Sequence, residues 1–204
     1  MDDLAAHARR LRLLPPSSGP VRLVAVDGHA GSGKTTFAAR LATALGGAPV
    51  LHLDDLATHE ELFGWTDRLR DQVLTPFSRG EPARYTPYDW TARRFGAPRT
   101  LDPAPVVLIE GVGAGRAALR PSLAALLWIE LDPMRSWERG RLRDGPGLTD
   151  FWDGWVVAER RHFGRDPSYP FADAVIQQGP EGYVWLEGPR VTAGKNLIIT
   201  QSEE

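Results

Sequence analysis

The chain has 204 residues, of which 42% are hydrophobic and 25% are charged, as is typical of a globular protein. Its formal net charge of −2 provides no broad basic field, so we expect neither nucleic acid nor a membrane as a partner. The lack of cysteine excludes disulfides, thiolate metal sites and a cysteine nucleophile. No stretch approaches the ~20 apolar residues of a membrane span, and the N-terminus does not resemble a secretory signal. We therefore expect a cytoplasmic protein with one domain over 1–204.

Strand-like and helix-like patterns alternate along the chain. This alternation predicts an α/β fold, with a mostly parallel five-stranded sheet, helices on both faces and a short lid. In chain order, we expect a helix at 4–14, a linker at 15–20, a strand at 21–26, a helix at 34–45, a strand at 49–53, a helix at 60–78, irregular structure at 81–105, strands at 106–109 and 124–131, helices at 134–143 and 150–164, and a strand at 172–176. Two β-like pieces in the tail over 180–204, at 183–186 and 197–200, have no predicted place in the sheet.

A glycine-rich segment between the first strand and the second helix fits the pattern G-x-x-x-x-G-K-[ST]. Its glycines allow positive φ and let backbone amides approach phosphate oxygens, while the following helix directs its positive dipole end at them. We expect Lys34 to bridge the β- and γ-phosphates of ATP and the Thr35 hydroxyl to bind Mg²⁺. His29 is expected to fill the loop, and Asp27 to form a structural hydrogen bond. The predicted ATP-binding residues are Gly28, Ala30, Gly31, Ser32, Gly33, Lys34, Thr35 and Thr36.

Acidic residues follow the next two strands, where ligands of open α/β sheets bind. A kinase uses a carboxylate to orient or deprotonate the acceptor hydroxyl, and further carboxylates to hold Mg²⁺. We assign Asp54 as the base and Glu110 to the metal site. For Asp55, the interpretation as an N-cap of a helix starting within 56–61 is preferred to a catalytic role.

These motifs together resemble the uridine kinase family of P-loop kinases, whose wider relatives include phosphoribulokinase and pantothenate kinase. The resemblance covers about residues 21–179. It includes the phosphate loop and five further segments: Leu53-Asp54-Asp55 where the family has Asp-Ser-Phe-Tyr, Tyr88-Asp89-Trp90 where it has Tyr-Asp-Phe, Val107-Leu108-Ile109-Glu110-Gly111, the arginine-rich lid helix at Asp132–Asp144, and the late strand Ala172-Asp173-Ala174-Val175-Ile176. The phosphate loop is the specific motif, and the order of the others strengthens it.

The resemblance implies roles for particular residues. It implies Asp54 as the base, with Thr35, Asp54 and Glu110 around Mg²⁺. It places Tyr88 and Trp90 in the acceptor pocket. Lid arginines would neutralise charge on the transferring phosphoryl group, although a solvated helix face is the plainer alternative. The arginines concerned are Arg139 and Arg143, with Arg141 as a further candidate.

The chain departs from the family pattern at three places. Leu56-Ala57 replaces an aromatic pair after Asp54, Arg93 stands where the family has a histidine, and Gly145-Pro146-Gly147 shortens the lid. Phosphoryl transfer tolerates these changes more easily than pyrimidine specificity does. Arg93, Arg94 and Arg99 could contact an acidic or phosphorylated acceptor, or could be exposed loop residues. Trp152, Trp155 and Phe163 are expected to pack their helix on the core.

The sequence therefore predicts an ATP- and Mg²⁺-dependent kinase that phosphorylates a hydroxyl of a small acceptor such as a nucleoside. One alternative is a nucleoside monophosphate kinase, in which extra arginines hold an acceptor phosphate. Another is a non-catalytic module whose ATP state controls a partner protein. No pattern identifies the acceptor or the oligomeric state, a homo-oligomer included.

Overall fold

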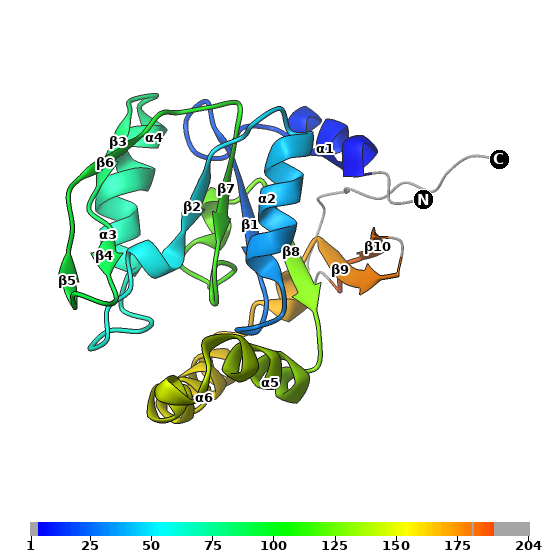
Figure 1. Cartoon of the computed structure of the whole chain (residues 1–204). Coiled ribbons are helices and arrows are strands. Elements are labelled where there is room, and N and C mark those ends of the chain that lie inside the picture. Colours follow the sequence, from blue (N-terminus) through cyan, green and yellow to red (C-terminus); the bar gives the residue numbers. More distant parts are fainter. Residues whose placement is uncertain (1–3, 181, 190–204) are drawn as a thin grey trace.

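The computed structural model describes residues 4–180 and 182–189 (Figure 1). Its centre is a six-stranded sheet in the order β10-β9-β8-β1-β7-β2. Five strands are parallel, and β10 is antiparallel to β9. The strands are β1 (Arg22–Asp27), β2 (Val50–His52), β7 (Val106–Glu110), β8 (Ala125–Glu130), β9 (Ala174–Gly179) and β10 (Gly182–Glu187).

The predicted count of five strands is therefore wrong by one. The five expected strands form the parallel part of the sheet, and the tail piece at 183–186 is the sixth, β10. An alternating pattern shows that a segment is extended, but the pattern does not name its neighbour in the sheet. The other expected tail piece, at 197–200, lies outside the described residues.

Alternate residues of the central strands face two separate apolar cores. Leu23 and Ala25 of β1 pack on one face, beneath α3 (Thr66–Leu69), a π-helical turn (Arg70–Leu74) and α4 (Thr75–Ser78). Val24 and Val26 pack on the other face, beneath α1 (Leu4–Leu13) and α2 (Lys34–Ala44). Burial on both faces explains why β1 is a continuous apolar run rather than an alternating one.

The region between β2 and β7 differs from its prediction in two ways. The helix expected at 60–78 begins only at Thr66, because 58–64 forms turns in which Thr58 Oγ1 accepts the Glu61 amide at 3.0 Å. The region 81–105, expected to be irregular, contains two small antiparallel pairs of strands. These pair β3 (Ala83–Tyr85) with β6 (Arg99–Leu101), and β4 (Tyr88–Asp89) with β5 (Arg94–Phe95).

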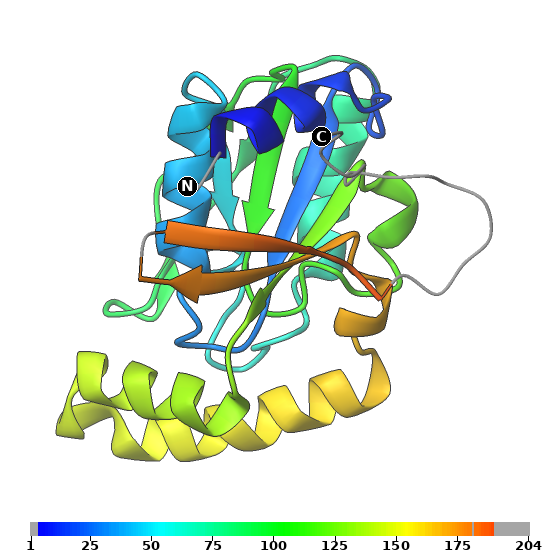
Figure 2. The same cartoon turned by 90° about the vertical axis from the view of Figure 1, so that its right-hand side faces the viewer.

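A helical hairpin lies across the carboxyl edge of the sheet (Figures 1 and 2). It consists of α5 (Pro133–Asp144) and α6 (Thr149–Arg165), joined through a 3₁₀ turn at Pro146–Leu148. The helices approach closely at Gly140, where an added Cβ would lie 2.2 Å from Cη2 of Trp152. A third apolar cluster beneath the hairpin contains Val112, Trp137, Trp152 and Trp155. The hairpin thus forms a wall over the edge at which ligands of such sheets bind.

Three shorter 3₁₀ turns complete the described elements, at Leu53–Asp55, Arg120–Ser122 and Tyr169–Phe171. Within the described ranges, no helix combines the length and the apolar character needed to cross a bilayer.

Candidate active site

The phosphate loop connects β1 to α2 at the carboxyl edge of the sheet. Gly31 has a φ of 85°, and a Cβ there would lie 1.9 Å from the carbonyl oxygen of Ser136, so the loop packs directly on α5. The first backbone bond of α2 runs from Phe37 N to Gly33 O, so the amides of residues 33–36 have no partner within the helix. Ser32 Oγ is buried and has no hydrogen-bond partner in the part of the chain that the structure describes. Such a group is suited to accept or donate a bond to a bound phosphate.

Two side chains hold the loop in place. Asp27, which is fully buried, accepts the amides of Gly28 and Gly113 through Oδ1 at 2.7 and 2.9 Å, and that of Gly115 through Oδ2 at 2.8 Å. This is the structural role expected for Asp27. His29 packs its ring edge-on against Trp128, Trp137 and Phe163, and its Nδ1 donates to Glu159. His29 is thus part of the packing behind the loop, as expected.

Lys34, Thr35 and Glu110 lie together beside the loop. Lys34 Nζ donates to the carbonyl of His29 at 2.9 Å. Glu110 Oε1 accepts both the Thr35 hydroxyl at 3.1 Å and Nδ1 of His52 at 2.6 Å. Burial alone would raise the pKa of Glu110, but the bond from His52 and the charge of Lys34 outweigh it and hold this pKa below its ordinary value. The same bond raises the pKa of His52.

A cavity of about 440 Å³ lies over the phosphate loop. It brings together residues that the sequence assigned to ATP, to Mg²⁺ and to the phosphoryl group. Arg139 and Arg143 reach it from α5. Its lining includes Ala30, Gly31, Gly33, Lys34, Thr35, Thr36, Asp54, Glu110, Arg139, Arg143 and Trp155.

A second cavity of about 540 Å³ adjoins the first. Four aromatic side chains line it: Trp90 comes from the loop after β4, and Phe151, Trp152 and Trp155 come from α6. His59 stands between these groups, with its ring 4.7 Å from that of Trp90 and 6.3 Å from that of Phe151. The full lining is Ala30, Asp54, His59, Trp90, Thr91, Arg143, Asp144, Leu148, Phe151, Trp152 and Trp155.

Asp54 lies where the two cavities meet, because it lines both. Its backbone carbonyl accepts Nε1 of Trp90 at 3.0 Å, which fixes the turn that carries it. The side chain is open to the cavities, but the surrounding protein removes much of the bulk water. This desolvation, together with the charge of Glu110, raises the pKa of Asp54 above its ordinary value, although Lys34 opposes the shift. A carboxylate with a raised pKa is a better proton acceptor when ionised.

Several predicted residues lie outside these cavities. Tyr88 is buried behind the second one, hydrogen-bonded to His59 at 3.0 Å. Arg93 forms an ion pair with Glu60 at 3.6 Å, and Arg141 forms one with Asp153 at 2.6 Å. Arg141 projects away because it is only two residues from Arg139 and from Arg143 on the same helix.

Asp55 does not cap a helix, so that interpretation is wrong. It ends the 3₁₀ turn Leu53–Asp55, and its carboxylate accepts the Tyr85 hydroxyl at 3.2 Å. The capping role required a helix starting within 56–61, and the structure has no helix there.

Sequence reasoning missed the contribution of α6 to the second cavity. Trp152 and Trp155 do pack on the core as expected, but both also expose an edge to the cavity, as does Phe151. The spacing of Phe151, Trp152 and Trp155 could have indicated this wall, because it places three aromatic residues on one side of a helix. His59 gave no signal, because it precedes the helix expected at 60–78 and belongs to none of the motifs.

The chemistry of the first cavity fits a magnesium ion bound with ATP. The described residues contain no group of three histidine, aspartate or glutamate side chains placed to hold a metal ion. Mg²⁺ in kinases, however, is held by one or two protein oxygens together with phosphates and waters. Thr35 and Glu110, 3.1 Å apart at the mouth of the loop, provide such a pair.

The comparisons with known proteins bear on the fold. No protein-family model and no curated protein matches the sequence. Among solved structures, a "possible uridine kinase" from Bacillus stearothermophilus matches with a TM-score of 0.56 and 18% identity, over 85% of this chain and 97% of that one. A "putative fructose transport system kinase" from Silicibacter sp. TM1040 also has a TM-score of 0.56, with 24% identity over 79% of this chain and 89% of that one. The chain has the fold of the uridine kinase-like P-loop kinases. At this level of identity the likeness concerns the P-loop kinase fold alone, and the roles of individual residues rest on the geometry described above.

Proposed function

We propose that the protein is an ATP-dependent phosphotransferase that moves the γ-phosphate to a hydroxyl of a small acceptor such as a nucleoside. One observation carries this proposal: Asp54 lines both the cavity over the phosphate loop and the adjoining aromatic cavity. A hydroxyl group held in the aromatic cavity therefore has a carboxylate beside it and the phosphate loop beyond. That arrangement suits in-line transfer between two bound molecules.

The residues of the first cavity would divide the work of binding and charge neutralisation. The loop amides and Lys34 bind the phosphates of ATP, and Thr35 and Glu110 would hold Mg²⁺, which neutralises phosphate charge when bound. Arg139 and Arg143 face the same space from α5, where guanidinium groups stabilise charge on the transferred group. Asp54 orients the attacking hydroxyl and accepts its proton.

The second cavity supports an acceptor that carries a planar ring. Three tryptophans and a phenylalanine line it, and such side chains stack readily on a flat heterocycle. The cavity beside Asp54 thus has aromatic rings from α6 in its wall, although the chain lacks the family's aromatic pair after Asp54. This supports a nucleoside or a similar cyclic alcohol, and makes no choice among bases.

The geometry gives less support to a nucleoside monophosphate as the acceptor. Arg143 is the only cation lining the aromatic cavity among the described residues, and Asp144 binds it through two bonds of 2.6 and 2.9 Å. Arg93 and Arg99, which could have held an acceptor phosphate, instead pair with Glu60 and Asp55. No observation favours the non-catalytic module, since such a module has no need of a carboxylate between two cavities.

The proposal is tested by measuring ADP release with a panel of nucleosides, nucleoside monophosphates and small alcohols. We expect nucleosides, or alcohols with a planar ring, to stimulate release above the basal rate, and Asp54→Asn to abolish the stimulation. Stimulation by nucleoside monophosphates alone would instead favour a nucleoside monophosphate kinase. Tight ATP binding without any response across the panel would overturn the proposal.

A further inference from the structure

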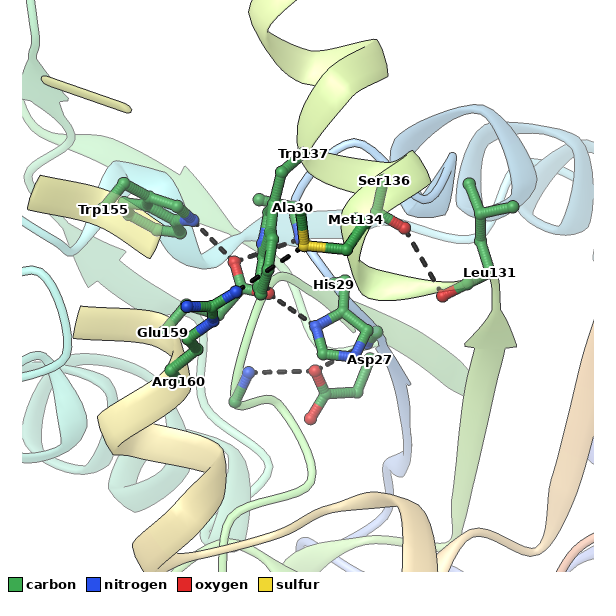
Figure 3. A network of polar contacts seen from close by, with 12 residues as sticks. Asp27, His29, Ala30, Leu131, Met134, Ser136, Trp137, Trp155, Glu159 and Arg160 are labelled. Carbon is green, nitrogen blue, oxygen red and sulfur yellow. Dashed lines mark hydrogen bonds and ion pairs between the residues drawn. The ribbon is translucent and has the colours of Figure 1, made fainter. Parts of the chain in front are cut away.

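A buried carboxylate on α6 connects the helical hairpin to the phosphate loop, and the proposed mechanism has not used it (Figure 3). Glu159 has 0% of its surface exposed. Its Oε1 accepts Nδ1 of His29 at 2.6 Å and Nε1 of Trp137 at 3.1 Å. Its Oε2 accepts Nε1 of Trp155 at 2.6 Å and the backbone amide of Ala30 at 3.2 Å. Each oxygen thus binds one donor from the phosphate loop and one tryptophan of the hairpin.

This arrangement uses the whole accepting capacity of an ionised carboxylate, which has about four lone-pair positions. Burial by itself favours the protonated form, but the bond from His29 and the charge of Lys34 outweigh it and hold the pKa of Glu159 below its ordinary value. Glutamine could not replace Glu159 without loss, because its amide nitrogen carries hydrogens and cannot accept from the two donors that it would face.

The two residues that donate to Oε2 of Glu159 lie at the junction of the two cavities. Ala30 and Trp155 both line the cavity over the phosphate loop and the aromatic cavity, and only Asp54 and Arg143 share that property in the described lining. Glu159 therefore fixes the distance between a loop amide beside the phosphates and an indole ring that forms a wall of the proposed acceptor cavity.

We propose that Glu159 is a positioning residue that couples the two cavities, by holding the phosphate loop and the Trp155 wall in register on either side of Asp54. This inference rests on the proposed function. It assigns to a side chain outside both cavities the task of aligning the phosphate donor with the acceptor.

Trp152 provides a matched control for Trp155. Both indoles come from α6, both are buried and both line the aromatic cavity, but Nε1 of Trp152 donates to Asp144 at 3.1 Å rather than to Glu159. Trp155→Phe and Trp152→Phe each remove one indole N–H and keep an aromatic ring. Only the first change reaches Glu159, so a difference between the two variants isolates the coupling.

The first measurement is hydrogen–deuterium exchange of the full chain without nucleotide. In Glu159→Gln and Trp155→Phe, we expect amides of residues 28–36 to exchange about tenfold faster or more, since each change leaves buried donors or acceptors unmatched. Trp152→Phe should leave this segment within about twofold of the unmodified protein. Equal effects of the two tryptophan variants on the loop would overturn the proposal.

The second measurement is the affinity for a non-hydrolysable ATP analogue with Mg²⁺, by calorimetry. Glu159→Gln and Trp155→Phe should each weaken binding by roughly tenfold, and the double variant should be little weaker than the worse single one, because both break one network. Independent, multiplying losses would contradict the coupling. If Glu159→Gln does not fold, as circular dichroism would show, the comparison of Trp155→Phe with Trp152→Phe still decides the matter.

Turnover separates positioning from general structural support. With the nucleoside that gives the highest rate in the panel, Trp155→Phe should lower kcat, whereas Trp152→Phe should act mainly on the acceptor KM. The reverse pattern would count against the proposal. Failure of the proposed function is distinguishable: the unmodified chain would then show no acceptor-stimulated ADP release, while the exchange experiment would still report whether Glu159 orders the loop.

Discussion

The two cavities that meet at Asp54 differ in how the chain builds them. In the cavity over the phosphate loop, the residues expected to bind phosphate come from one continuous segment, 30–36, which provides six of the fifteen lining residues. The aromatic cavity has no such dominant segment for its acceptor wall, and is assembled from residues at 30, 54, 59, 90–91, 143–144 and 148–155. A binding site made from one short segment can remain the same while the rest of the fold changes, whereas a site assembled from distant segments changes with each of them. This difference explains why the sequence predicts the phosphate-binding residues but does not identify the acceptor.

The sharpest test of the comparison concerns the residue that the cavities share. Asp54→Asn should lower turnover by about 10²–10⁴-fold, because the amide cannot accept the acceptor's proton. The affinity for ATP should change little, since the phosphates are held by the loop and Lys34. Steady-state kinetics and calorimetry on the same preparation give both numbers. Near-normal turnover would remove Asp54 from the mechanism.

A second change should affect the loop cavity alone. Lys34→Ala removes a charged donor from the phosphates, and should weaken binding of Mg-ATP by about ten- to a hundredfold. Arg141→Ala is the control, because it also removes a positive charge near the site, but from a residue paired with Asp153. Calorimetry should find the control within about twofold of the unmodified protein. Unchanged affinity in the lysine variant would contradict phosphate binding by this loop.

The third change should act on the aromatic cavity and, through the bond from Trp90 Nε1 to the Asp54 carbonyl, on the turn that carries Asp54. Trp90→Ala removes a ring from its wall, and should raise the acceptor KM by about five- to a hundredfold, the usual effect of losing one stacking partner. Trp90→Phe keeps a ring and should lose less. The KM for ATP should stay near its original value in both variants. A selective loss of ATP binding would mean that the two cavities have been assigned the wrong way round.

The smallest expected effect is on stability and its pH dependence. The raised pKa of Asp54 means that the folded protein holds this proton more strongly than the unfolded chain does. The stability of the unmodified protein should therefore fall as pH rises through the interval between the ordinary and the raised pKa. Asp54→Asn does not titrate, so in EDTA without nucleotide it should melt at a slightly higher temperature at neutral pH, and lose this advantage at acidic pH. An advantage that does not vary with pH would point to another cause.

The sequence predicted some parts of this fold better than others. The strands at 21–26 and 106–109 were correctly located, because burial on both faces produces an uninterrupted apolar run. The helix expected at 60–78 was too long by about two turns, because 58–64 forms turns closed by hydrogen bonds between Thr58 and Glu61. No sequence pattern indicates a buried role for Glu159, because a glutamate on a helix is usually solvated.

The phosphate loop, the alternation of strands and helices, and the acids at the strand ends could be predicted from the sequence, because they depend on neighbouring residues and on the geometry of a parallel sheet. The aromatic rings around Asp54, the positions of Arg93 and Arg141, and the donors around Glu159 could be seen only in the folded chain. These features depend on how α6 and the loops after β2 and β4 pack against each other. Such packing joins residues up to 130 positions apart, as between His29 and Glu159, and local pattern carries no record of it.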